Sequence, residues 1–459
     1  MNVDGVLFIS CFLPAILLLH WLIPSERFRN VLLLIAGLVF CAFGSLSGLV
    51  LLVLVAAVNY LMGRMILAGK GGKLPCAAAV IFDLAFLGFF KYLDFLLAKV
   101  LGLPGIQLGI VAPIGISFYI FKCISYIVDT WRDREQGTRR FDTLLLYISF
   151  FPQFTAGPIA RFSRFRGQLV GRQRDPERIA QGIRRFVVGL GKKLILAGTL
   201  AGVADGMFVL TPETLSTRSA WLGAVAYMLQ IYFDFSGYSD MAIGLGQAFG
   251  FETVENFHYP YAAVSITDFW RRWHISLSSW FKDYLYIPLG GNRKGKVRAG
   301  LNKAVVFLCC GIWHGANWTF LLWGAWHGLL SSLESAGVIR TKGGFLSRCY
   351  TLLAVCLGFV MFRAETVGQG FFMLKSMFTG FYASTQSTPA LLEVLTGEAV
   401  FVLLLSSLLA LPIMPRLKTL SCRVRILEPA SYVLCILLFV LCLMKLASGG
   451  FAPFIYAQF

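Results

Sequence analysis

The chain has 459 residues, of which 57% are hydrophobic and 14% are charged, and its 41 Lys and Arg residues outnumber its 23 Asp and Glu residues to give a net charge of +18. Soluble globular domains carry about 25% charged residues, so this composition excludes an ordinary soluble enzyme. The basic residues lie in short loops between apolar runs. Cytoplasmic loops of membrane proteins show this distribution, so the positive charge indicates topology and predicts no nucleic-acid partner.

Long stretches of the chain contain no Asp, Glu, Lys or Arg at all: Gly5–Pro24, Asn30–Gly63, Val400–Pro415 and Ala430–Met444. A helix needs about 20 mostly apolar residues to cross the hydrocarbon core of a bilayer. The alternating segments of about ten residues that mark an outer-membrane barrel are missing from the sequence. The pattern predicts an all-α polytopic membrane protein, forming a single domain over residues 1–459 in contact with the lipid bilayer. The first run has no basic start and no small-residue cleavage site, so we expect it to be retained.

Loop spacing predicts two different kinds of segment in the first half. Residues 30–63 lie between basic ends and have Gly and Ser at 44–48, which predicts a helical hairpin. Further along the chain, one basic loop ends at Arg140 and the next begins at Arg161. Only 20 residues, 141–160, separate these two loops, and they include two prolines. That length is too short to cross twice, and one crossing would place basic residues outside, against the charge rule. Because irregular backbone at membrane depth is tolerated inside protein or beside a cavity, we expect a re-entrant segment over 142–158.

The segment Thr267–Gly295 reads TDFWRRWHISLSSWFKDYLYIPLGGNRKG and is dense in aromatic and basic residues. At about 100° per residue, most of its aromatic side chains fall on one side of a helix and most of its charged side chains on the other. Helices of this kind lie in the membrane interface. We therefore predict one interfacial amphipathic helix over 267–287, with Thr267 as its N-cap and His274 on a mostly apolar row.

The stretch Leu301–Glu334 again has 34 residues between basic ends, with the turn sequence WHGAN at 313–317 in its middle. Two full spans need about 40 residues, so we expect short or re-entrant helices over 301–334. Their turn would then lie inside the hydrocarbon zone, with His314 beside a cavity. His327 lies in the following helix, and we expect it to have a structural or supporting role.

Two histidines are the candidates for chemistry. Burial keeps an imidazole neutral, and a neutral imidazole can take a proton from a hydroxyl, as the general base of an acyl transfer does. His314 and His274 are therefore the candidate catalytic residues. Patterns for a zinc site, a nucleophile elbow or a phosphate-binding loop are missing, and the eleven cysteines lie scattered, nearly all in apolar segments. We expect no metal and no permanently bound cofactor.

Several long motifs resemble the membrane-bound O-acyltransferase (MBOAT) family. They are FWRRWHISLSSWFKDYLYIPLGGNRKG, GIWHGANWTFLLWGAWHGL, APIGISFYIFKCISYIVD, FFPQFTAGPIARF and YFDFSGYSDMAIGLGQAFGF. Within the family, the chain is similar to the bacterial branch typified by the membrane subunit of the alginate O-acetylation machinery. The resemblance implies a ring of about 10–12 transmembrane helices around a thinned centre. It also implies that His314 is the catalytic histidine and His274 the second signature polar residue.

One stretch departs from the family pattern. Many relatives carry Ala-Asp after the KKxxx stretch, whereas Lys192–Leu196 leads here to Ala197 and Gly198. If that acid is needed for activity, either Asp205 substitutes for it or the activity is altered.

The residues and the resemblance together lead us to expect an O-acetyltransferase of the bacterial inner membrane. It would pass an acetyl group from an acyl thioester such as acetyl-CoA to an extracytoplasmic polysaccharide, through an SGNH-hydrolase-like partner outside the membrane. The expected substrate-binding residues fall into two groups. Cavity liners are Trp270, Trp313 and Asn317, and residues that attract an anionic donor are Arg271, Arg272 and Lys282.

Other functions stay open on the sequence alone. One is D-alanyl transfer to teichoic acid, although YLYIPLGGNRKG resembles the acetyl-transferring branch more closely. A second is a small-solute carrier without acyl chemistry, for which paired broken helices in the two halves are typical. A third is a non-catalytic scaffold of a secretion complex. The sequence does not identify the acceptor glycan.

Overall fold

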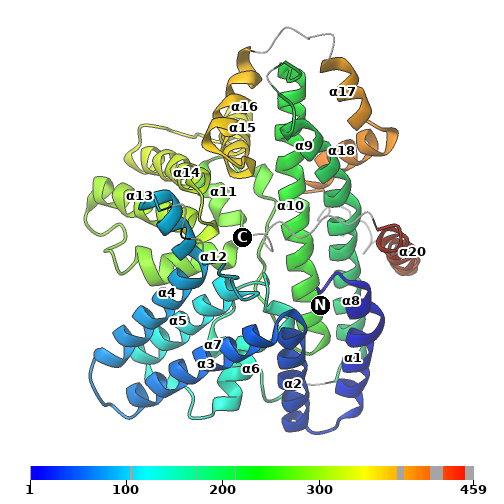
Figure 1. Ribbon diagram of the computed structural model, residues 1–459. Helices are drawn as coiled ribbons and strands as arrows, with labels where there is room; N and C mark the ends of the chain where they lie inside the picture. The colour runs from blue at the N-terminus through cyan, green and yellow to red at the C-terminus, as the bar shows by residue number, and fades with distance from the viewer. Residues whose placement is uncertain are drawn as a thin grey trace. The chain divides into compact units, whose positions relative to one another are not determined.

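The computed structural model describes residues 2–103, 106, 108–172, 174–211, 213–379, 387–413 and 427–449. Every regular element within these residues is a helix, which confirms the predicted all-α class. The chain divides into two compact units, which Figure 1 colours by residue number. The first unit holds Met1–Phe186 and Ser239–Glu255, and the second holds Val187–Tyr238 and Asn256–Phe459. The single domain expected over 1–459 stays a prediction.

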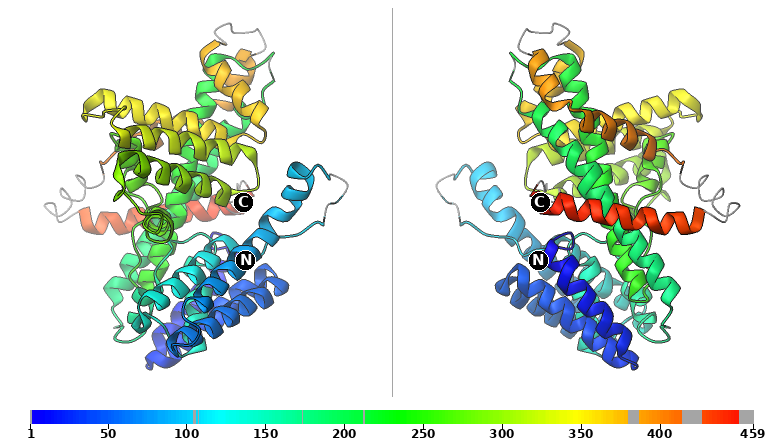
Figure 2. Two further views of the ribbon diagram at one scale, coloured as in Figure 1. Left: turned by 90° about the vertical axis from the view of Figure 1, so that its left-hand side faces the viewer. Right: turned by 90° about the vertical axis from the view of Figure 1, so that its right-hand side faces the viewer.

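The first unit is built mainly from antiparallel helices in its N-terminal half. Its α-helices are α1 (Leu13–Leu22), α2 (Glu26–Gly44), α3 (Leu46–Leu67), α4 (Leu74–Phe95), α5 (Ile116–Arg132), α6 (Phe141–Ser149) and α7 (Phe162–Gly167). Helices α2 to α5 contact one another in sequence order and lie side by side in Figures 1 and 2. The long helices α8 (Pro176–Gly191) and α10 (Thr217–Ala248) belong partly to each unit.

The hairpin predicted over 30–63 is confirmed as α2 and α3. The two helices are separated by Ser45 alone, which has an extended backbone with φ −169°. Its hydroxyl accepts a hydrogen bond from the Gly48 backbone N–H at 3.1 Å, so Ser45 caps the start of α3. A Ser cap and a change of backbone angle are enough to reverse the chain here.

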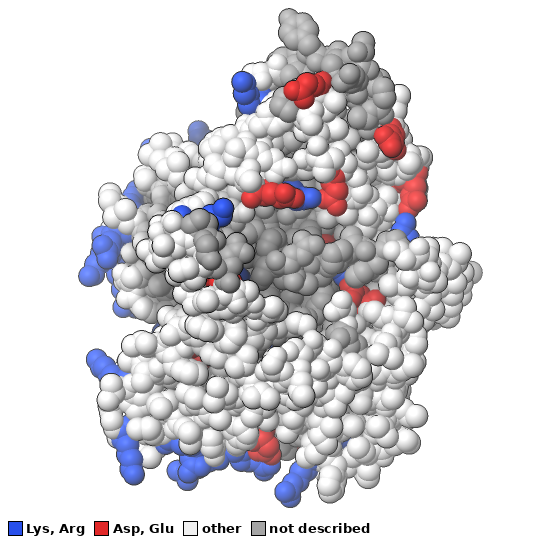
Figure 3. All heavy atoms as spheres, in the orientation of Figure 1, with Lys and Arg blue, Asp and Glu red and all other residues white. Residues whose placement is uncertain are grey.

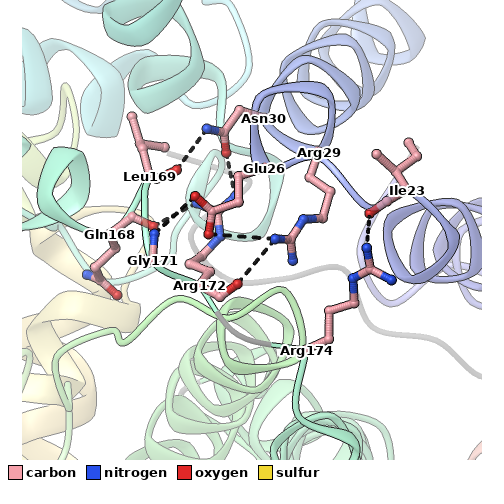
Figure 4. Close-up of polar contacts among 9 residues, drawn as sticks. All are labelled: Ile23, Glu26, Arg29, Asn30, Gln168, Leu169, Gly171, Arg172 and Arg174. Carbon is pink, nitrogen blue, oxygen red and sulfur yellow. Dashed lines mark hydrogen bonds and ion pairs between the residues drawn. The ribbon is translucent and has the colours of Figure 1, made fainter.

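The start of α2 is fastened to the loop that follows α7 (Figure 4). The buried Arg29 guanidinium donates to the Arg172 carbonyl at 3.2 Å, and the Asn30 amide donates to the Leu169 carbonyl at 3.0 Å. The Arg172 side chain donates in return to the Asn30 oxygen. Side-chain donors therefore satisfy loop carbonyls that no regular element would pair.

The segment 142–158 does not contain a helix long enough to cross a membrane. Helix α6 has 9 residues and is followed by a short 3-10 turn over Phe151–Gln153. At 1.5 Å per residue α6 rises about 14 Å, roughly half of the hydrocarbon thickness. The re-entrant path itself stays a prediction.

The second unit contains the C-terminal helices and several short or distorted turns. Its α-helices beyond α8 and α10 are α9 (Gly198–Phe208), α11 (Ile266–Arg272), α12 (Ile275–Phe281), α13 (Gly295–His314), α14 (Trp318–Ala336), α15 (Gly344–Arg363), α16 (Val367–Thr379), α17 (Ser387–Val394), α18 (Gly397–Leu409) and α20 (Leu427–Ala447). Lys192–Ala197 and Lys282–Tyr286 are π-helical.

Among the described residues, six helical segments are long and apolar enough to cross a membrane. They are Glu26–Gly44, Leu46–Leu67, Leu74–Val100, Pro176–Phe208, Gly344–Arg363 and Pro429–Ala447. On the face shown in Figure 3, most of the visible described surface belongs to uncharged residues. The protein is therefore a multi-pass membrane protein. Helices α10, α13 and α14 reach the same length but are less apolar, and the family's count of about 10–12 spans stays a prediction.

The hairpin expected to be short over 301–334 is longer than predicted. Helix α13 has 20 residues and begins at Gly295, and α14 has 19 residues. The prediction failed because it counted the basic residues at 296–303 as a loop, whereas the helix continues through them. The turn itself lies at Gly315–Asn317, where the sequence placed it.

Glycines let α13 and α14 pack at very short range (Figure 1). A methyl group on Gly324 would lie 2.5 Å from the Phe307 carbonyl oxygen, and one on Gly328 would lie 3.2 Å from the Ala304 Cα. Gly311 faces the Phe320 carbonyl in the same way. The absence of side chains at these positions fixes the distance between the two helices.

We predict that Gly324→Ala destabilises the protein by about 1–3 kcal/mol, because the added methyl group must push the two helices apart. The matched control is Gly202→Ala in α9, where no atom lies within 4 Å of the added Cβ. The control is expected to be neutral or to stabilise by up to about 1 kcal/mol. Thermal unfolding in detergent measures both, and equal midpoints for the two variants would contradict the packing account.

Candidate functional site

The amphipathic helix predicted over 267–287 is broken in the structure. Helix α11 ends at Arg272, α12 begins at Ile275, and Trp273 between them is extended. His274 has φ 44° and ψ 54°, a left-handed conformation that costs a non-glycine residue about 1–2 kcal/mol. The prediction of one continuous helix is wrong because side-chain periodicity does not reveal a single strained residue.

Asn256 holds the break from a neighbouring segment of chain. Its backbone carbonyl accepts a hydrogen bond from the Ile275 N–H at 3.0 Å. Its side-chain oxygen Oδ1 lies 3.1 Å from His274 Nδ1 and accepts from the Ser276 N–H at 3.1 Å and the Ser276 hydroxyl at 2.9 Å. Asn256 and His274 are both 0% exposed. The sequence analysis missed Asn256, because no motif or periodicity connects it with a histidine 18 residues away.

The His274 imidazole is neutral at physiological pH. His274 lies outside the six apolar segments, and its burial lowers its pKa from 6.5 to about 3. Removing a charged group from water disfavours the charged form, which for histidine is the protonated one. A neutral imidazole has one N–H and one nitrogen lone pair.

Helix α11 is tied to α14 by a carboxylate that the sequence analysis also missed. Glu334 accepts hydrogen bonds from the backbone N–H groups of Ile266 at 2.7 Å and Thr267 at 2.9 Å. The N-cap is Ser265, whose hydroxyl accepts from the Asp268 N–H at 2.9 Å, so the expectation that Thr267 caps the helix is wrong. Thr267 instead donates its hydroxyl to Glu334 at 2.7 Å.

The structure brings the two candidate catalytic histidines into one aromatic cluster. The Trp313 ring centre lies 5.0 Å from that of His314 and 6.3 Å from that of His274. His314 is 3% exposed and stands perpendicular to Trp323, with ring centres 5.0 Å apart. Trp313 is therefore the ring between the two imidazoles, and it contacts both.

His327 belongs to the same cluster on its other side. Its Nδ1 accepts a hydrogen bond from the Trp270 indole N–H at 3.3 Å, and the two rings are perpendicular. Trp323 contacts His327 at 5.2 Å and Trp270 at 5.6 Å between ring centres. His327 is 0% exposed, and a methyl group on Gly358 of α15 would lie 2.8 Å from its Nε2. The supporting role expected for His327 stays a prediction.

A cavity of about 990 Å³ lies beside α11, α12 and the start of α13. It is lined by three of the predicted substrate-binding residues, Trp270, Arg271 and Lys282. Its complete set of basic side chains is Arg271, Lys282, Arg293, Lys296 and Lys303, and none of the described residues that line it is acidic. A concave wall with one sign of charge attracts ligands of the opposite sign, so this cavity suits an anionic ligand.

A smaller apolar pocket of about 170 Å³ adjoins the basic cavity. The two share Trp270, Lys282 and Lys303, and the smaller pocket continues to Phe307 and Cys310 of α13. Trp270 lines both spaces and also contacts Trp323, whose ring packs on His314. Two indole rings therefore connect the cavity wall to His314.

The other three predicted binding residues do not line the basic cavity. Arg272 forms an ion pair with Asp268 at 3.0 Å. Asn317 caps α14 by accepting from the Thr319 N–H at 3.2 Å. Trp313 is 4% exposed within the aromatic cluster. Neighbours on a helix point about 100° apart, which explains why Arg271 faces the cavity and Arg272 does not.

The stretch that departs from the family pattern contains a buried ion pair. Lys193 and Asp234 are joined at 2.7 Å, with side chains 1% and 6% exposed. A Cβ added at Gly198 would meet the Lys193 carbonyl oxygen at 3.8 Å, an ordinary van der Waals contact. Asp205, the expected substitute for the missing acid, pairs with Arg363 at 2.6 Å.

Within the described residues, no group of three or more His, Cys, Asp and Glu side chains is placed to hold a metal ion.

These features define a multi-pass helical membrane protein with neutral buried imidazoles beside a basic cavity. Residues 78–342 match the model of the membrane-bound O-acyltransferase family. The chain belongs to this family and is an O-acyltransferase.

Individual relatives support the same assignment along almost the whole chain. The chain is 40% identical to the probable alginate O-acetylase AlgI of Pseudomonas putida, over 98% of this chain and 99% of that protein. It is 44% identical to the protein of the same name from Pseudomonas syringae, over 81% and 74%. It is 35% identical to the peptidoglycan O-acetyltransferase of Helicobacter pylori, over 81% and 78%.

We predict that Lys193→Met destabilises the protein by about 3–5 kcal/mol, because the Asp234 carboxylate is left buried without its cation. The matched control is Lys445→Met, which removes a more exposed pair with Glu398, whose side chains are 31% and 59% exposed. Exposed pairs contribute about 0–1 kcal/mol. Thermal unfolding in detergent measures both effects. The double variant Lys193→Met/Asp234→Leu should recover stability, and failure to recover would contradict this explanation.

Proposed function

We propose that the protein is an O-acetyltransferase of the bacterial inner membrane that supplies acetyl groups to an extracytoplasmic polysaccharide. The observation that carries the proposal is the pairing of an anion-attracting cavity with buried imidazoles, connected by Trp270. Relatives with acetyl-transferring names, at 35–44% identity, support acetyl as the group transferred. These relatives are named for acetylating alginate and peptidoglycan, so the acceptor class is a glycan.

The donor in this proposal is an acyl thioester such as acetyl-CoA, which carries negative phosphates. The basic cavity, with Arg271 and Lys282 on its wall, binds the anionic part from the cytoplasmic side. The adjoining apolar pocket receives the thioester end near Trp270. Because Trp270 and Trp323 connect the cavity wall to His314, these rings must shift for the thioester carbon to reach that imidazole.

In the chemical step, His314 takes the proton from the acceptor hydroxyl. The hydroxyl oxygen forms a bond to the thioester carbonyl carbon, the carbon–sulfur bond breaks, and the leaving thiolate receives the proton from the His314 imidazolium. General bases of this kind contribute about 10²- to 10⁴-fold to the rate. Delivery to a polymer then depends on an SGNH-hydrolase-like partner outside the membrane, which accepts the acetyl group and passes it to the glycan.

D-alanyl transfer to teichoic acid is the second candidate. The chain is 28% identical to the teichoic acid D-alanyltransferase of Bacillus subtilis over 56% of this chain, which is a lower and shorter similarity. A basic cavity would accept the anionic part of either donor. Supplying acetyl and D-alanyl thioesters side by side to the purified protein separates the two candidates.

We predict that His314→Ala lowers acyl transfer from a thioester by at least about 100-fold, since the proton acceptor is lost. The matched control is His258→Ala, an exposed histidine in the same unit. It should keep wild-type activity. Release of free thiol by purified protein in detergent measures turnover, and thermal unfolding checks that both variants fold. Full activity in a folded His314→Ala protein would contradict the assignment.

We predict that Arg271→Gln and Lys282→Gln each raise the KM for a thioester donor by about three- to tenfold, because each removes one positive charge from the cavity wall. Arg272→Gln is the matched control, since this neighbouring arginine pairs with Asp268 away from the cavity. Steady-state kinetics at low and high salt make the measurement. High salt should raise the KM of the wild-type protein more than the KM of the two cavity variants, because each variant has one charge fewer for salt to screen. Equal KM values for Arg271→Gln and Arg272→Gln would contradict donor binding in this cavity.

A further inference from the structure

We propose that Asn256 is a positioning residue that holds His274 in the tautomer with a proton on Nδ1, so that His274 Nε2 accepts a hydrogen bond from a second hydroxyl of the acceptor, next to the one that His314 deprotonates. The inference rests on the proposed function for the identity of the substrate, and on geometry alone for the tautomer. It gives a specific role to His274, which the sequence analysis named only as a candidate catalytic residue.

The hydrogen bonds around Asn256 establish which atom of its amide faces His274. The Ser276 backbone N–H can only donate, and it lies 3.1 Å from the Asn256 atom in question. That atom is therefore the oxygen Oδ1, which can only accept. His274 Nδ1 lies 3.1 Å from the same oxygen, so Nδ1 must carry the proton that forms this bond.

The second nitrogen of His274 follows from the first. A neutral imidazole has one N–H, so Nε2 carries a lone pair and acts as an acceptor. Nε2 is buried and has no hydrogen-bond partner among the described residues. A buried acceptor without a partner is unfavourable by about 1–3 kcal/mol, so Nε2 is available to accept a hydrogen bond from a bound group. A lone pair cannot donate to a thioester carbonyl, whereas it can accept from a hydroxyl.

The backbone around His274 is held in place by the same neighbour. The strained left-handed conformation of His274 is fixed on one side by the Ile275 N–H bond to the Asn256 carbonyl at 3.0 Å. On the other side, the His258 N–H donates to the Arg272 carbonyl at 2.9 Å. Strained residues fixed from several directions are typical of functional sites. His327 has the opposite tautomer, because its Nδ1 accepts from Trp270 and leaves Nε2 protonated.

The first test reads the tautomer directly and needs no activity. The full-length protein is labelled with ¹⁵N-histidine, which gives signals from only five residues, and the His274 signals are identified by their loss in His274→Gln. The expected spectrum has a protonated Nδ1 and an unprotonated Nε2 for His274. A protonated Nε2 in the wild-type protein would overturn the proposal, whether or not the protein transfers acyl groups.

The second test compares variants of Asn256 in acyl transfer. Asn256→Leu removes the oxygen that accepts a hydrogen bond from His274 Nδ1–H. It should lower kcat for transfer to the acceptor substrate by about tenfold, which corresponds to the loss of one hydrogen bond. The KM for the thioester donor should stay within about twofold of the wild-type value. Asn256→Asp keeps an oxygen for Nδ1–H and should restore both kcat and the tautomer. Ser276→Ala is the matched control, since it removes one of the other bonds to the same oxygen and leaves His274 bonded.

Each outcome of the second test decides the proposal. Wild-type kcat in Asn256→Leu, or an Asn256→Asp protein as impaired as Asn256→Leu, would overturn the positioning role. A raised donor KM in Asn256→Leu would place His274 beside the donor and overturn its contact with the acceptor. If the wild-type protein transfers no acyl group at all, the proposed function fails, and the ¹⁵N spectra still confirm or overturn the tautomer.

Discussion

The close contact between α13 and α14 determines where His314 and His327 lie relative to each other. Gly324 and Gly328 let the two helices approach until backbone touches backbone, and a side chain at either position would separate them. His314 ends one helix of this pair, and His327 lies in the middle of the other. Glu334, on the same helix as His327, fixes the start of α11. The position of Trp270 against His327 therefore depends on Glu334, and the position of His314 beside α14 depends on the glycine contact.

Burial of neutral imidazoles among aromatic rings gives the site its chemical character. A ring such as Trp313 or Trp323 excludes water without offering a charge, and burial keeps the His274 imidazole unprotonated, with its tautomer selected by a hydrogen bond. Asn256 selects one tautomer for His274, and Trp270 selects the other for His327. Next to this uncharged cluster lies a cavity whose charged lining residues are all basic. The separation of an electrostatic binding region from an apolar reaction region suits a charged donor with an uncharged reactive end.

Sequence reasoning was most successful where a local rule applies. The hairpin around Ser45 follows from one cap and two apolar runs, and the turn at Gly315–Asn317 follows from residues that interrupt a helix. The basic side of the 267–287 segment indicated an anionic partner, and Arg271 and Lys282 do line a cavity. The identity of the candidate histidines came from their apolar surroundings. In each case the relevant neighbours are within about one or two helical turns.

The features that the sequence did not predict depend on contacts between distant segments. The break at His274 is stabilised from Asn256, and the start of α11 from Glu334, and neither residue belongs to the helix it controls. Arg272 looked equivalent to Arg271 on composition, yet Asp268 on the same helix takes it as an ion-pair partner. The length of α13 was underestimated because a basic helical start and a basic loop have the same composition. Contacts between distant segments, and not periodicity, decide the break at His274 and the start of α11.

The most direct test of the account follows one labelled acetyl group through reconstituted protein. Purified protein is placed in lipid vesicles, and a thioester with a radiolabelled acetyl group and a distinguishable thiol portion is supplied on one side. A sugar hydroxyl acceptor and the SGNH-hydrolase-like partner are supplied on the other side. The account predicts labelled O-acetyl ester on the acceptor side and free thiol on the donor side, with both lost in His314→Ala. Arrival of the intact thioester on the acceptor side, with no ester formed, would contradict it and identify a carrier.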